Sequence, residues 1–474
     1  MKWKTNIKSN NRIIALSDIH GDIHSLIIAL RDCAKVIKKK ITNPDIIDYP
    51  VEILLEYDLN LDIDKSIPFY KDNLDYEWCG NNTFVVICGD FLDGFRNSFG
   101  NYRIPFIDSR CDKCMDLEYD QIEIKIFRFI NTLNETAIKK GGRIFKILGN
   151  HEFINLNDES LNNYIPDWTK SLKNYYKGMT REEYFKLDNE GGKLIFKGGA
   201  GLLLIINGNI FVHGRLDHSK TYNNYKQINH ILNILGNQSL KKRIIRELNS
   251  SCNLTIWGRK YNRNFNNYEN EKDLSSNQHE KCKQIKIYLE QFINEIKTRP
   301  YNIEDIRVIV GHCPQYLNSN EYYRSTVNSS FNTIEKYENY EKLSFPVRTS
   351  KSDNDFIFGI GMECNKKDLD NPSKFPNYAD NDDRIYYDND DRFIYKIDVG
   401  SSRGFDQRLD KTIFTKLSEK GTIGARVSQV LEINKGIVTI LRSTVKNTRI
   451  HQPRHQYEQY IKEKSISELY ILHP

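Results

Sequence analysis

Oxygen and nitrogen side chains that can bind a metal ion follow five short apolar runs of this chain. Each run is rich in β-branched residues and ends in a turn, which is the pattern of a buried strand followed by a loop. The candidate metal ligands in these turns are Asp18, His20, Asp90, Asn150, His213 and His312. Strand ends in α/β sheets are where ligand sites assemble. We therefore expect the turns to converge on two divalent metal ions about 3.5–4 Å apart, the usual apparatus of hydrolytic phosphoryl transfer.

The same five runs predict where the strands lie. They span residues 13–16, 84–88, 144–148, 210–212 and 308–310. One such turn alone carries little information, because Gly-Asp, Gly-Asn and Gly-His pairs are common in loops. Five strand–turn units in one chain, each offering a suitable ligand atom, favour a metal centre over ordinary turn chemistry.

Sequence blocks around these ligands resemble the signature blocks of the calcineurin-like metallophosphoesterases, and in particular of the phosphoprotein phosphatases. The blocks are SDIHGD at 17–22, GDFLDG at 89–94, GNHE at 149–152, VHG at 212–214 and GHCP at 311–314. Flanking segments are similar to the bacterial-type, Shewanella-like branch of protein phosphatases. Those segments are IWGRKY at 256–261, VGHCPQ at 310–315, IDVGSSRGFD at 397–406 and VLEI at 430–433. The resemblance implies an α/β fold, a four-layer α/β/β/α sandwich of two mixed sheets with long insertions.

The resemblance also implies how the ligands divide between two metal ions. Asp18 and His20 would bind one ion, and Asp90 would bridge both. The remaining ligands of the second ion would be Asn150, His213 and His312. A bridging carboxylate is physically required, because two dications this close repel one another. Carboxylate, imidazole and amide ligands together favour Mn, Fe or Zn over Ca.

By the same resemblance, a hydroxide bridging the metals would attack phosphorus directly, because metal coordination lowers its pKa towards about 7. His151, next to the ligand Asn150, would be the general acid that protonates the leaving oxygen. Asp93 would hydrogen-bond this imidazole and keep it cationic. A buried structural histidine is the alternative for His151, but its place beside a metal ligand favours the catalytic role.

Phosphate oxygens also require cationic side chains. Arg259, after Trp257-Gly258, lies where the resembling branch has a phosphate-binding arginine, whose guanidinium can bind two oxygens at once. The chain departs from the family pattern at Gly94, where an arginine is expected, and at Arg215, where a second glycine is common. Arg215, or Arg96 two positions after Gly94, could supply the missing charge.

These residues together indicate a metal-dependent phosphatase of phosphomonoesters, with phosphoprotein (Ser/Thr or Tyr) as the favoured substrate and a small phosphoester as the other choice. An alternative enzyme is a nucleotide or dinucleoside polyphosphate hydrolase, because related folds use the same metals. A different class is a non-catalytic phosphate-binding scaffold of the same fold, suggested by Gly94 and the long insertions. A nuclease is disfavoured, because no basic stripe is interleaved with aromatic residues.

Composition sets further limits. The 474 residues are 39% hydrophobic and carry a formal net charge of +6, which is mild for this size and indicates neither nucleic acid nor a membrane surface. No apolar stretch approaches the ~18 residues of a membrane span. The N-terminus lacks the apolar segment of a signal peptide, which predicts a cytoplasmic or other intracellular protein. Nine cysteines without a framework pattern predict reduced thiols, and the lone Cys111-x-x-Cys114 pair is weak evidence for zinc.

The motifs span most of the chain, which predicts one catalytic domain over residues 1–442, followed by a basic tail at 443–474. Insertions are expected at about 41–80, 95–120, 155–200, 217–300 and 316–392. Helical spacing predicts a helix over 23–37, which Lys38–Lys40 would close, and a second helix over 122–137. Residues 217–300 are expected to be mostly helical. Residues 316–392 lack clear periodicity. Segments 392–399 and 425–441 are β-patterned and would complete a second sheet.

Overall fold

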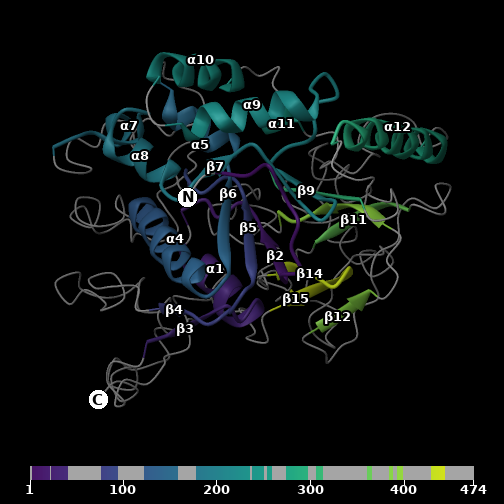
Figure 1. The fold of residues 1–474 in the computed structure, drawn as a ribbon, viewed down its shortest axis with the longest axis horizontal. Coiled ribbons are helices and arrows are strands. Elements are labelled where there is room, and N and C mark those ends of the chain that lie inside the picture. The colour runs from purple at the N-terminus through teal and green to yellow at the C-terminus, as the bar shows by residue number, and fades with distance from the viewer. Residues whose placement is uncertain are drawn as a thin grey trace, which may run out of the picture.

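Two β-sheets face each other in the computed structural model, and helices cover their outer faces (Figure 1). The structure describes residues 3–21, 23–40, 76–93, 122–157, 178–234, 237–249, 254–258, 274–296, 306–312, 360–365, 384–387, 392–398 and 429–442. The predicted tail at 443–474 and the arginines at 96 and 259 lie outside these residues, as does the Cys111–Cys114 pair.

The larger sheet has seven strands and a parallel centre. Its strand order is β12 (Arg384–Tyr387), β15 (Ile437–Arg442), β14 (Gln429–Asn434), β2 (Ile13–Leu16), β5 (Phe84–Cys88), β6 (Arg143–Ile147) and β7 (Ala200–Gly201). β2 pairs with β5 from Ile13 opposite Phe84, and β5 pairs with β6 from Phe84 opposite Arg143, all parallel. The carboxyl ends of these three strands therefore meet at one edge of the sheet.

The smaller sheet has six strands. Its strand order is β1 (Asn6–Ile7), β8 (Leu203–Ile206), β9 (Asn209–Val212), β10 (Arg307–Val310), β13 (Arg392–Lys396) and β11 (Gly361–Asn365). β9 and β10 are parallel neighbours, with Ile210 opposite Val308. All five strands predicted to precede metal ligands are present. β2 and β5 have the predicted bounds, and β6, β9 and β10 begin one residue earlier.

The strands are apolar on both faces because each sheet is covered on both sides. Between the sheets, Ala15 and Val86 of one sheet and Phe211, Ile309 and Tyr395 of the other belong to one buried core. Alternate residues of the same strands point outward into a second core that includes the helices. Because both faces of these strands are buried, the strands appear in the sequence as continuous apolar runs.

The outer layers are helical. On the seven-stranded sheet lie α1 (Ile23–Ile28), the π-helical turn η1 (Ala29–Cys33) and α4 (Ile122–Lys139). α9 (Tyr222–Asn233) contacts β7 of the seven-stranded sheet and β8 of the six-stranded sheet, and α12 (Leu274–Asn294) lies on β11 of the six-stranded sheet. The remaining helices are α5 (Asn150–Leu156), α7 (Arg181–Phe185), α8 (Glu190–Phe196), α10 (Gln238–Asn249) and α11 (Leu254–Trp257). The predicted α/β/β/α layering is confirmed, as are the helix from residue 122 and the helices within 217–300.

The helix predicted over residues 23–37 is wrong over its last four residues. After α1 and η1 the chain turns into β3 (Ile37–Lys39), which pairs with β4 (Tyr76–Trp78) in a two-stranded sheet. Lys38 therefore does not end a helix, and its Nζ atom lies 3.0 Å from Glu77 Oε1 on the paired strand. Isoleucine and valine suit a strand as well as a buried helix face, so partner strand β4, distant in sequence, decides the outcome.

Two predictions about the C-terminal strands are also corrected. β13 joins the six-stranded sheet, whereas β14 pairs antiparallel with β2 of the seven-stranded sheet, with Leu431 opposite Ala15. They do not complete one sheet, because β14 and β15 fill the open side of β2. Residues 316–392, which lack periodicity, nevertheless contain β11 and β12, which pair with β13 and β15.

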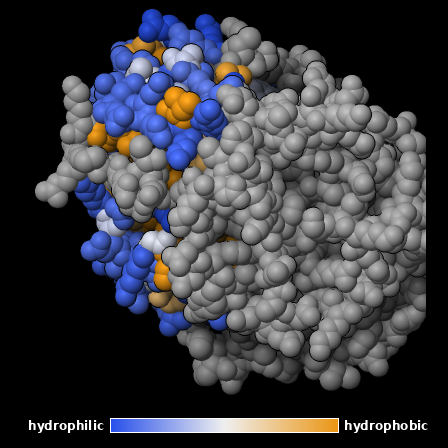
Figure 2. Space-filling model, turned by 90° about the vertical axis from the view of Figure 1, so that its right-hand side faces the viewer, coloured by the Kyte–Doolittle hydropathy of each residue, from blue (hydrophilic) through white to orange (hydrophobic). Residues whose placement is uncertain are grey.

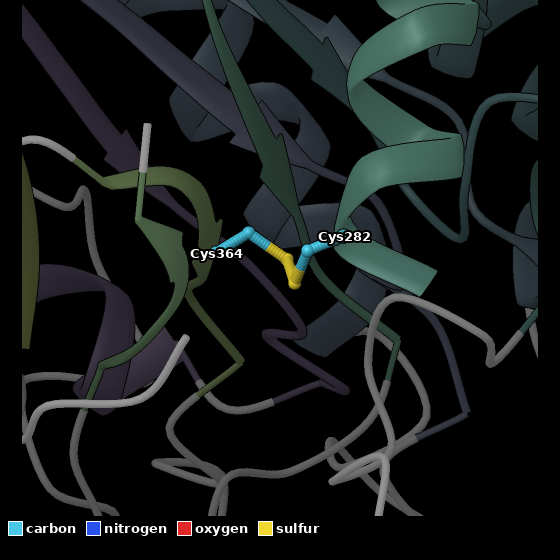
Figure 3. Close-up of a disulfide and its surroundings, with 2 residues drawn as sticks. All are labelled: Cys282 and Cys364. Carbon is cyan, nitrogen blue, oxygen red and sulfur yellow. A yellow bond between two sulfur atoms is a disulfide. The ribbon is translucent and has the colours of Figure 1, made fainter. Parts of the chain in front are cut away.

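A disulfide joins α12 to the edge strand β11 (Figure 3). Cys282 and Cys364 are 82 residues apart, and their Cα atoms lie 5.4 Å apart. The prediction of reduced thiols is wrong for this pair, because both side chains are buried at the point where the helix packs on the strand. Among the described residues, Cys79 and Cys88 are free thiols, and Cys33 is buried and outside this disulfide.

The described part of the surface is mainly hydrophilic on the face that Figure 2 shows, with hydrophobic residues scattered among polar ones. The large hydrophobic side chains recorded as exposed are Ile287 and Ile437. Of the helices in the described ranges, none has the length and apolar character needed to cross a bilayer.

Candidate metal centre

The predicted ligands come together where the carboxyl ends of the two sheets meet. Those on the seven-stranded sheet follow β2, β5 and β6, and those on the six-stranded sheet follow β9 and β10. Two hydrogen bonds join the sheets here: His213 Nδ1–H donates to the Cys88 carbonyl at 2.8 Å, and the His312 backbone N–H donates to Asp18 Oδ2 at 2.9 Å. All six predicted ligands are buried. The structure therefore brings all six predicted side chains together at one place.

Asp90 lies between two groups of potential ligands. One group is His20, Asp90 and His151, and the other is Asp90, His213 and His312, with the ligand atoms of each group within 4.8 Å of one another. Asp90 Oδ2 lies 3.5 Å from His20 Nε2, and Asp90 Oδ1 lies 3.3 Å from His213 Nε2. Each carboxylate oxygen of Asp90 therefore faces a different histidine, one in each group.

The remaining predicted ligands complete the two groups. Asn150 Oδ1 lies 3.0 Å from His213 Nε2, and His312 Nδ1 lies 3.1 Å from the same nitrogen. Asp18 Oδ1 lies 3.7 Å from His20 Nε2. Asp18 Oδ1 is buried and accepts no hydrogen bond, which is costly for a carboxylate oxygen unless a cation contacts it. The residues present thus fit a pair of divalent cations.

Hydrogen bonds behind the histidines fix which ring nitrogen faces the centre. The Nδ1 atom of His213 is used by the Cys88 carbonyl, and the Nδ1 atom of His20 lies 3.0 Å from the Leu92 carbonyl. A carbonyl oxygen only accepts, so both Nδ1 atoms carry the hydrogen. Both Nε2 atoms then face the ligand groups, where a bound cation would take their lone pairs in place of a proton, the arrangement that metal-ligating histidines adopt.

Four candidate ligands have backbone angles in the left-handed region. Asp18, His20, Asp90 and His312 have φ values of 55°, 43°, 54° and 73°, a region that is uncommon for residues other than glycine. Each such residue costs about 1–3 kcal/mol and persists only where the surrounding structure imposes it. Ordinary turns of this chain, such as the one at Asn81, also occupy this region, so the angles accompany the site but do not by themselves identify it.

Two glycines make the close approach of the turns possible. A Cβ atom at Gly149 would overlap the carboxylate of Asp90, and one at Gly311 would overlap the Ser17 hydroxyl and lie 2.6 Å from Asp18 Oδ2. Each of these contacts is shorter than real Cβ atoms show. The glycine before Asn150 and the glycine before His312 are therefore required for the ligands to meet.

The buried charges of the site shift the pKa values of its titratable groups. Burial, the largest single effect, would lower the pKa of His213, but the charges of Asp90 and Asp18 and the hydrogen bonds to Asp90 and the Cys88 carbonyl together raise it to about 9. Burial raises the pKa of Asp18 to about 6, against the opposing charge of His213. Protons on these groups compensate the carboxylates, so a bound cation would replace protons.

His151 is held by Asp93, as predicted. His151 Nδ1 lies 2.7 Å from Asp93 Oδ2, and its ring packs edge-on against the His20 ring with centroids 4.9 Å apart. Its other nitrogen, Nε2, lies 3.9 Å from Asp90 Oδ2 and so faces the ligand groups. This geometry places an imidazole nitrogen beside the centre and a carboxylate behind it.

Sequence reasoning missed the side chains behind Asp93. Arg181, the first residue of α7, donates from Nη2 to Asp93 Oδ1, from Nε to Glu123 Oε2 and from Nη1 to Asn155 Oδ1, each at 2.8 Å. Glu123 Oε1 accepts the Asp93 backbone N–H at 2.7 Å. Burial, the Arg181 charge and the His151 hydrogen bond act on Asp93 together, and its pKa is lowered. The only sequence signal was the capping pattern Thr180-x-x-Glu183, which marks the helix but not the role of Arg181.

Glu152 is the second residue to which sequence reasoning assigned no role, although it belongs to the GNHE block. Its carboxylate accepts the backbone N–H groups of four residues. These residues are Asp90 at 2.9 Å, Phe91 at 2.8 Å, Leu92 at 3.1 Å and Gly149 at 2.9 Å. Burial and the charge of Asp90 raise the pKa of Glu152 to about 8. Glu152 thus binds the turn after β5 to the start of α5.

Arg215 lies next to the segment that carries the other predicted arginine. A Cβ atom at Gly258 would lie 2.5 Å from Arg215 Cγ, so the arginine stem runs along the residue that precedes Arg259. The Arg215 Nε atom is buried and has no hydrogen-bond partner. Trp257 of the same segment packs edge-on to His312, with centroids 6.3 Å apart. Arg259 itself is outside the described residues.

Comparison with known proteins finds partial relatives. Over 151 residues the chain is 30% identical to Shewanella-like protein phosphatase 1 of Plasmodium berghei (strain Anka), which covers 32% of this chain and 25% of that protein. The resemblance to Shewanella-like protein phosphatases is confirmed over this part of the chain. Over 119 residues the chain is 29% identical to an uncharacterized protein of Schizosaccharomyces pombe, with 25% of this chain and 28% of that protein covered. The chain thus spans about a quarter of the length of these relatives.

No family model matches the chain. Among solved structures, the cold-active protein-tyrosine phosphatase of a psychrophilic Shewanella species aligns at 17% identity and a TM-score of 0.37, covering 66% of this chain and 69% of that one. Its I115M mutant gives the same identity and TM-score. The two sheets and the register of their strands define the fold.

Proposed function

We propose that the chain is a metal-dependent phosphatase that hydrolyses phosphomonoesters, with phosphorylated protein as its substrate. The observation that carries this proposal is the position of Asp90, whose two oxygens face two separate groups of nitrogen and oxygen ligands. A single structural metal would not need a carboxylate shared between two groups. The named relative, a protein phosphatase, supports the same activity.

In this proposal the side chains divide as the sequence resemblance implies. Asp18 and His20 hold one cation, and Asp90 contributes to both sites. The other ligands of the second cation are Asn150, His213 and His312. Divalent cations bound there supply Lewis acidity that polarises the phosphate and lowers the pKa of water.

His151 supplies the proton in the proposed reaction. The oxygen of a water molecule forms a bond to phosphorus and releases a proton to solvent. As the bond between phosphorus and the leaving oxygen breaks, its electron pair goes to that oxygen, and His151 Nε2 donates the proton that neutralises it. Asp93 accepts from His151 Nδ1 and holds the ring so that Nε2 faces the centre. The products are an alcohol and inorganic phosphate, and no covalent enzyme intermediate is needed.

Arg215 and Arg259 are proposed to bind the equatorial phosphate oxygens. The support is the unpartnered Nε atom of Arg215 and its position along Gly258, directly before Arg259. A guanidinium fits a phosphate group with two parallel hydrogen bonds. This arrangement would supply the positive charge that the chain lacks at Gly94.

The decisive experiment combines metal analysis with ester hydrolysis. Purified protein loaded with manganese should hold close to two ions per chain and hydrolyse 4-nitrophenyl phosphate and a phosphoserine peptide. His151→Asn should reduce turnover of the phosphopeptide by about 10²–10⁴, the usual contribution of a general acid, with metal content unchanged. Folded protein that binds no metal, or that binds two ions and hydrolyses neither ester nor a dinucleoside polyphosphate, would support a phosphate-binding scaffold instead.

A further inference from the structure

A closed network of buried side chains lies behind His151, on the side away from the metal ligands. It contains Asp93, Glu123, Asn155 and Arg181, all at most 4% exposed. These residues come from the turn after β5, from α4, from α5 and from α7. Four separate segments therefore meet at the carboxylate that holds the proposed proton donor.

From this network we infer that Arg181 and Glu123 are positioning residues for proton delivery, and that they act through Asp93 on His151. The inference rests on the proposed phosphatase function and deepens it. Neither residue contacts the reacting atoms. Their effect should be largest for phosphate esters of alkyl alcohols, which need a proton on the leaving oxygen.

The hydrogen bonds leave Asp93 a single orientation. Its Oδ2 atom accepts from His151 Nδ1 at 2.7 Å and from Asn155 Nδ2 at 2.8 Å, and its Oδ1 atom accepts from Arg181 Nη2 at 2.8 Å. Glu123 fixes the backbone of Asp93 through the N–H bond at 2.7 Å. With both oxygens and the backbone bound, the carboxylate cannot rotate away from His151.

Arg181 is fixed in turn. Its three donor nitrogens contact three different residues, and its guanidinium lies 5.3 Å from the centre of the Phe185 ring. The planar guanidinium has five N–H donors and can donate to these acceptors together, whereas the ammonium group of a lysine cannot. Asn155 completes the ring of contacts, because its Nδ2 atom also donates to the His151 carbonyl at 2.8 Å.

The network also pairs charges at Asp93. An Arg181 guanidinium nitrogen lies 2.8 Å from both Asp93 Oδ1 and Glu123 Oε2, so one cation is shared by two buried carboxylates. Buried charges are stable only when they are paired in this way. Removing Arg181 therefore takes away the contact that orients Asp93 Oδ1, and with it the support of the His151 ring.

A purely structural role for Arg181 is the competing explanation, because the network also joins α7 to α4 and α5. The two explanations differ in one measurable respect. A structural defect would lower the hydrolysis of every ester by the same factor. A defect in proton delivery would spare 4-nitrophenyl phosphate, whose leaving group is a weak base, and would affect a phosphoserine peptide, whose leaving alkoxide is a strong base.

The test compares kcat/KM on these two esters for manganese-loaded parent, Arg181→Met, Arg181→Lys and Glu123→Gln proteins. Arg128→Met is the matched control, because Arg128 is an exposed arginine on α4 whose side chain is 47% accessible. In Arg181→Met the ratio of alkyl to aryl hydrolysis should fall about 10-fold or more, a fraction of the 10²–10⁴ that a general acid contributes. Arg181→Lys and Glu123→Gln should give smaller falls, and Arg128→Met none.

Two further measurements separate the explanations. Metal content should stay at the parent level in Arg181→Met, although the unfolding temperature falls. In a His151→Asn background, Arg181→Met should lower the alkyl-to-aryl ratio no further, because the donor that it positions is already absent. An additional fall in that background would overturn the inference.

Equal losses on both esters with normal metal content would show that Arg181 is structural. If Arg181→Met does not fold, Asn155→Ala removes contacts to Asp93 and Arg181 without leaving a buried charge unpaired, and an unchanged ratio in that variant contradicts the inference. Failure of the proposed function has a different signature: the metal-loaded parent would then hydrolyse neither ester, and the inference would fall with it.

Discussion

The Nε2 atom of His213 lies 3.1 Å from the Nδ1 atom of His312, although the two residues are 99 positions apart in the chain. They follow β9 and β10, which are parallel neighbours, so the register of the sheet brings both turns to the same edge. Asp90 Oδ1, from the other sheet, lies 3.3 Å from the same His213 nitrogen. Two nitrogens and a carboxylate this close must share either a proton or a cation.

Metal binding should therefore release protons and strengthen with pH. Without metal, the carboxylates of Asp90 and Asp18 and the hydrogen bonds of the ring together overcome burial and raise the pKa of His213 to about 9, so between its ordinary value and this one the folded protein holds a proton that a cation must displace. The affinity for Mn²⁺ should rise between pH 6.5 and 8.5. Calorimetric titration at pH 7.5 in two buffers of different ionisation enthalpy would measure the released protons, and no release would contradict the proton–cation exchange.

The same pKa shift predicts how the metal-free protein responds to pH. A raised pKa in the folded state means that protonated His213 stabilises the fold below its ordinary pKa, and that this stabilisation is lost as the pH rises through about 9. Saturating Mn²⁺ should remove this dependence, because the cation replaces the proton.

Asp90→Asn should abolish hydrolysis and weaken both metal sites. The change keeps the size of the side chain but removes the negative charge that faces both ligand groups. Metal analysis after gel filtration is the measurement. Asp188→Asn is the control, because Asp188 is a partly exposed surface residue paired with Lys242. An Asp90→Asn protein that retains two ions would show that Asp90 does not bridge.

Glu152→Gln should destabilise the fold by about 1–3 kcal/mol, the cost of leaving buried hydrogen-bonding groups unsatisfied. Glu152 accepts four backbone N–H groups with two oxygens, and glutamine would turn an NH2 group towards some of these donors. Urea unfolding of the metal-free protein measures the change. Glu135→Gln, on the exposed face of α4, should leave the midpoint unchanged, and equal midpoints for both variants would contradict the role of Glu152.

Arg215→Ala and Arg259→Ala should each raise KM and lower kcat, by about 1–3 kcal/mol in transition-state binding, the range for a hydrogen bond to a charged group. Arg215 has a buried Nε atom without an acceptor, which a phosphate oxygen would satisfy. Arg243→Ala, which removes an exposed arginine of α10, serves as the control. If Arg215→Ala has the kinetics of the parent, Arg215 does not bind phosphate.

Removing the disulfide should lower the free energy of unfolding by about 2–5 kcal/mol, because the cross-link between Cys282 and Cys364 restricts an 82-residue segment of the unfolded chain. The double variant Cys282→Ala/Cys364→Ala and the parent treated with a strong reductant should show the same loss in thermal unfolding. Cys79→Ser, at a free thiol, should not. A double variant as stable as the parent would show that the bond contributes nothing.

The sequence predicted the parts of the site that follow from strand periodicity. Ligands directly after an apolar run, such as Asp90 after β5, could be placed because a parallel sheet aligns strand ends. Arg181 could not be placed, because its contacts reach Asp93, 88 residues away, and Glu123, 58 residues away, and leave no local pattern. The strand at Ile37 was missed for the same reason, since its partner Trp78 lies far along the chain.

Because of the close contacts at Gly149 and Gly311, the presence of every metal-binding side chain in a sequence does not show that the protein is active. An alanine at either position would leave every metal-binding side chain in the sequence yet push apart Asp90 and its neighbours at one position, or Ser17 and Asp18 at the other. Such a chain would look like an enzyme by its ligands and behave as a pseudoenzyme. In distinguishing active copies of this protein from decayed ones, these two glycines are as informative as the aspartates and histidines that they precede or face.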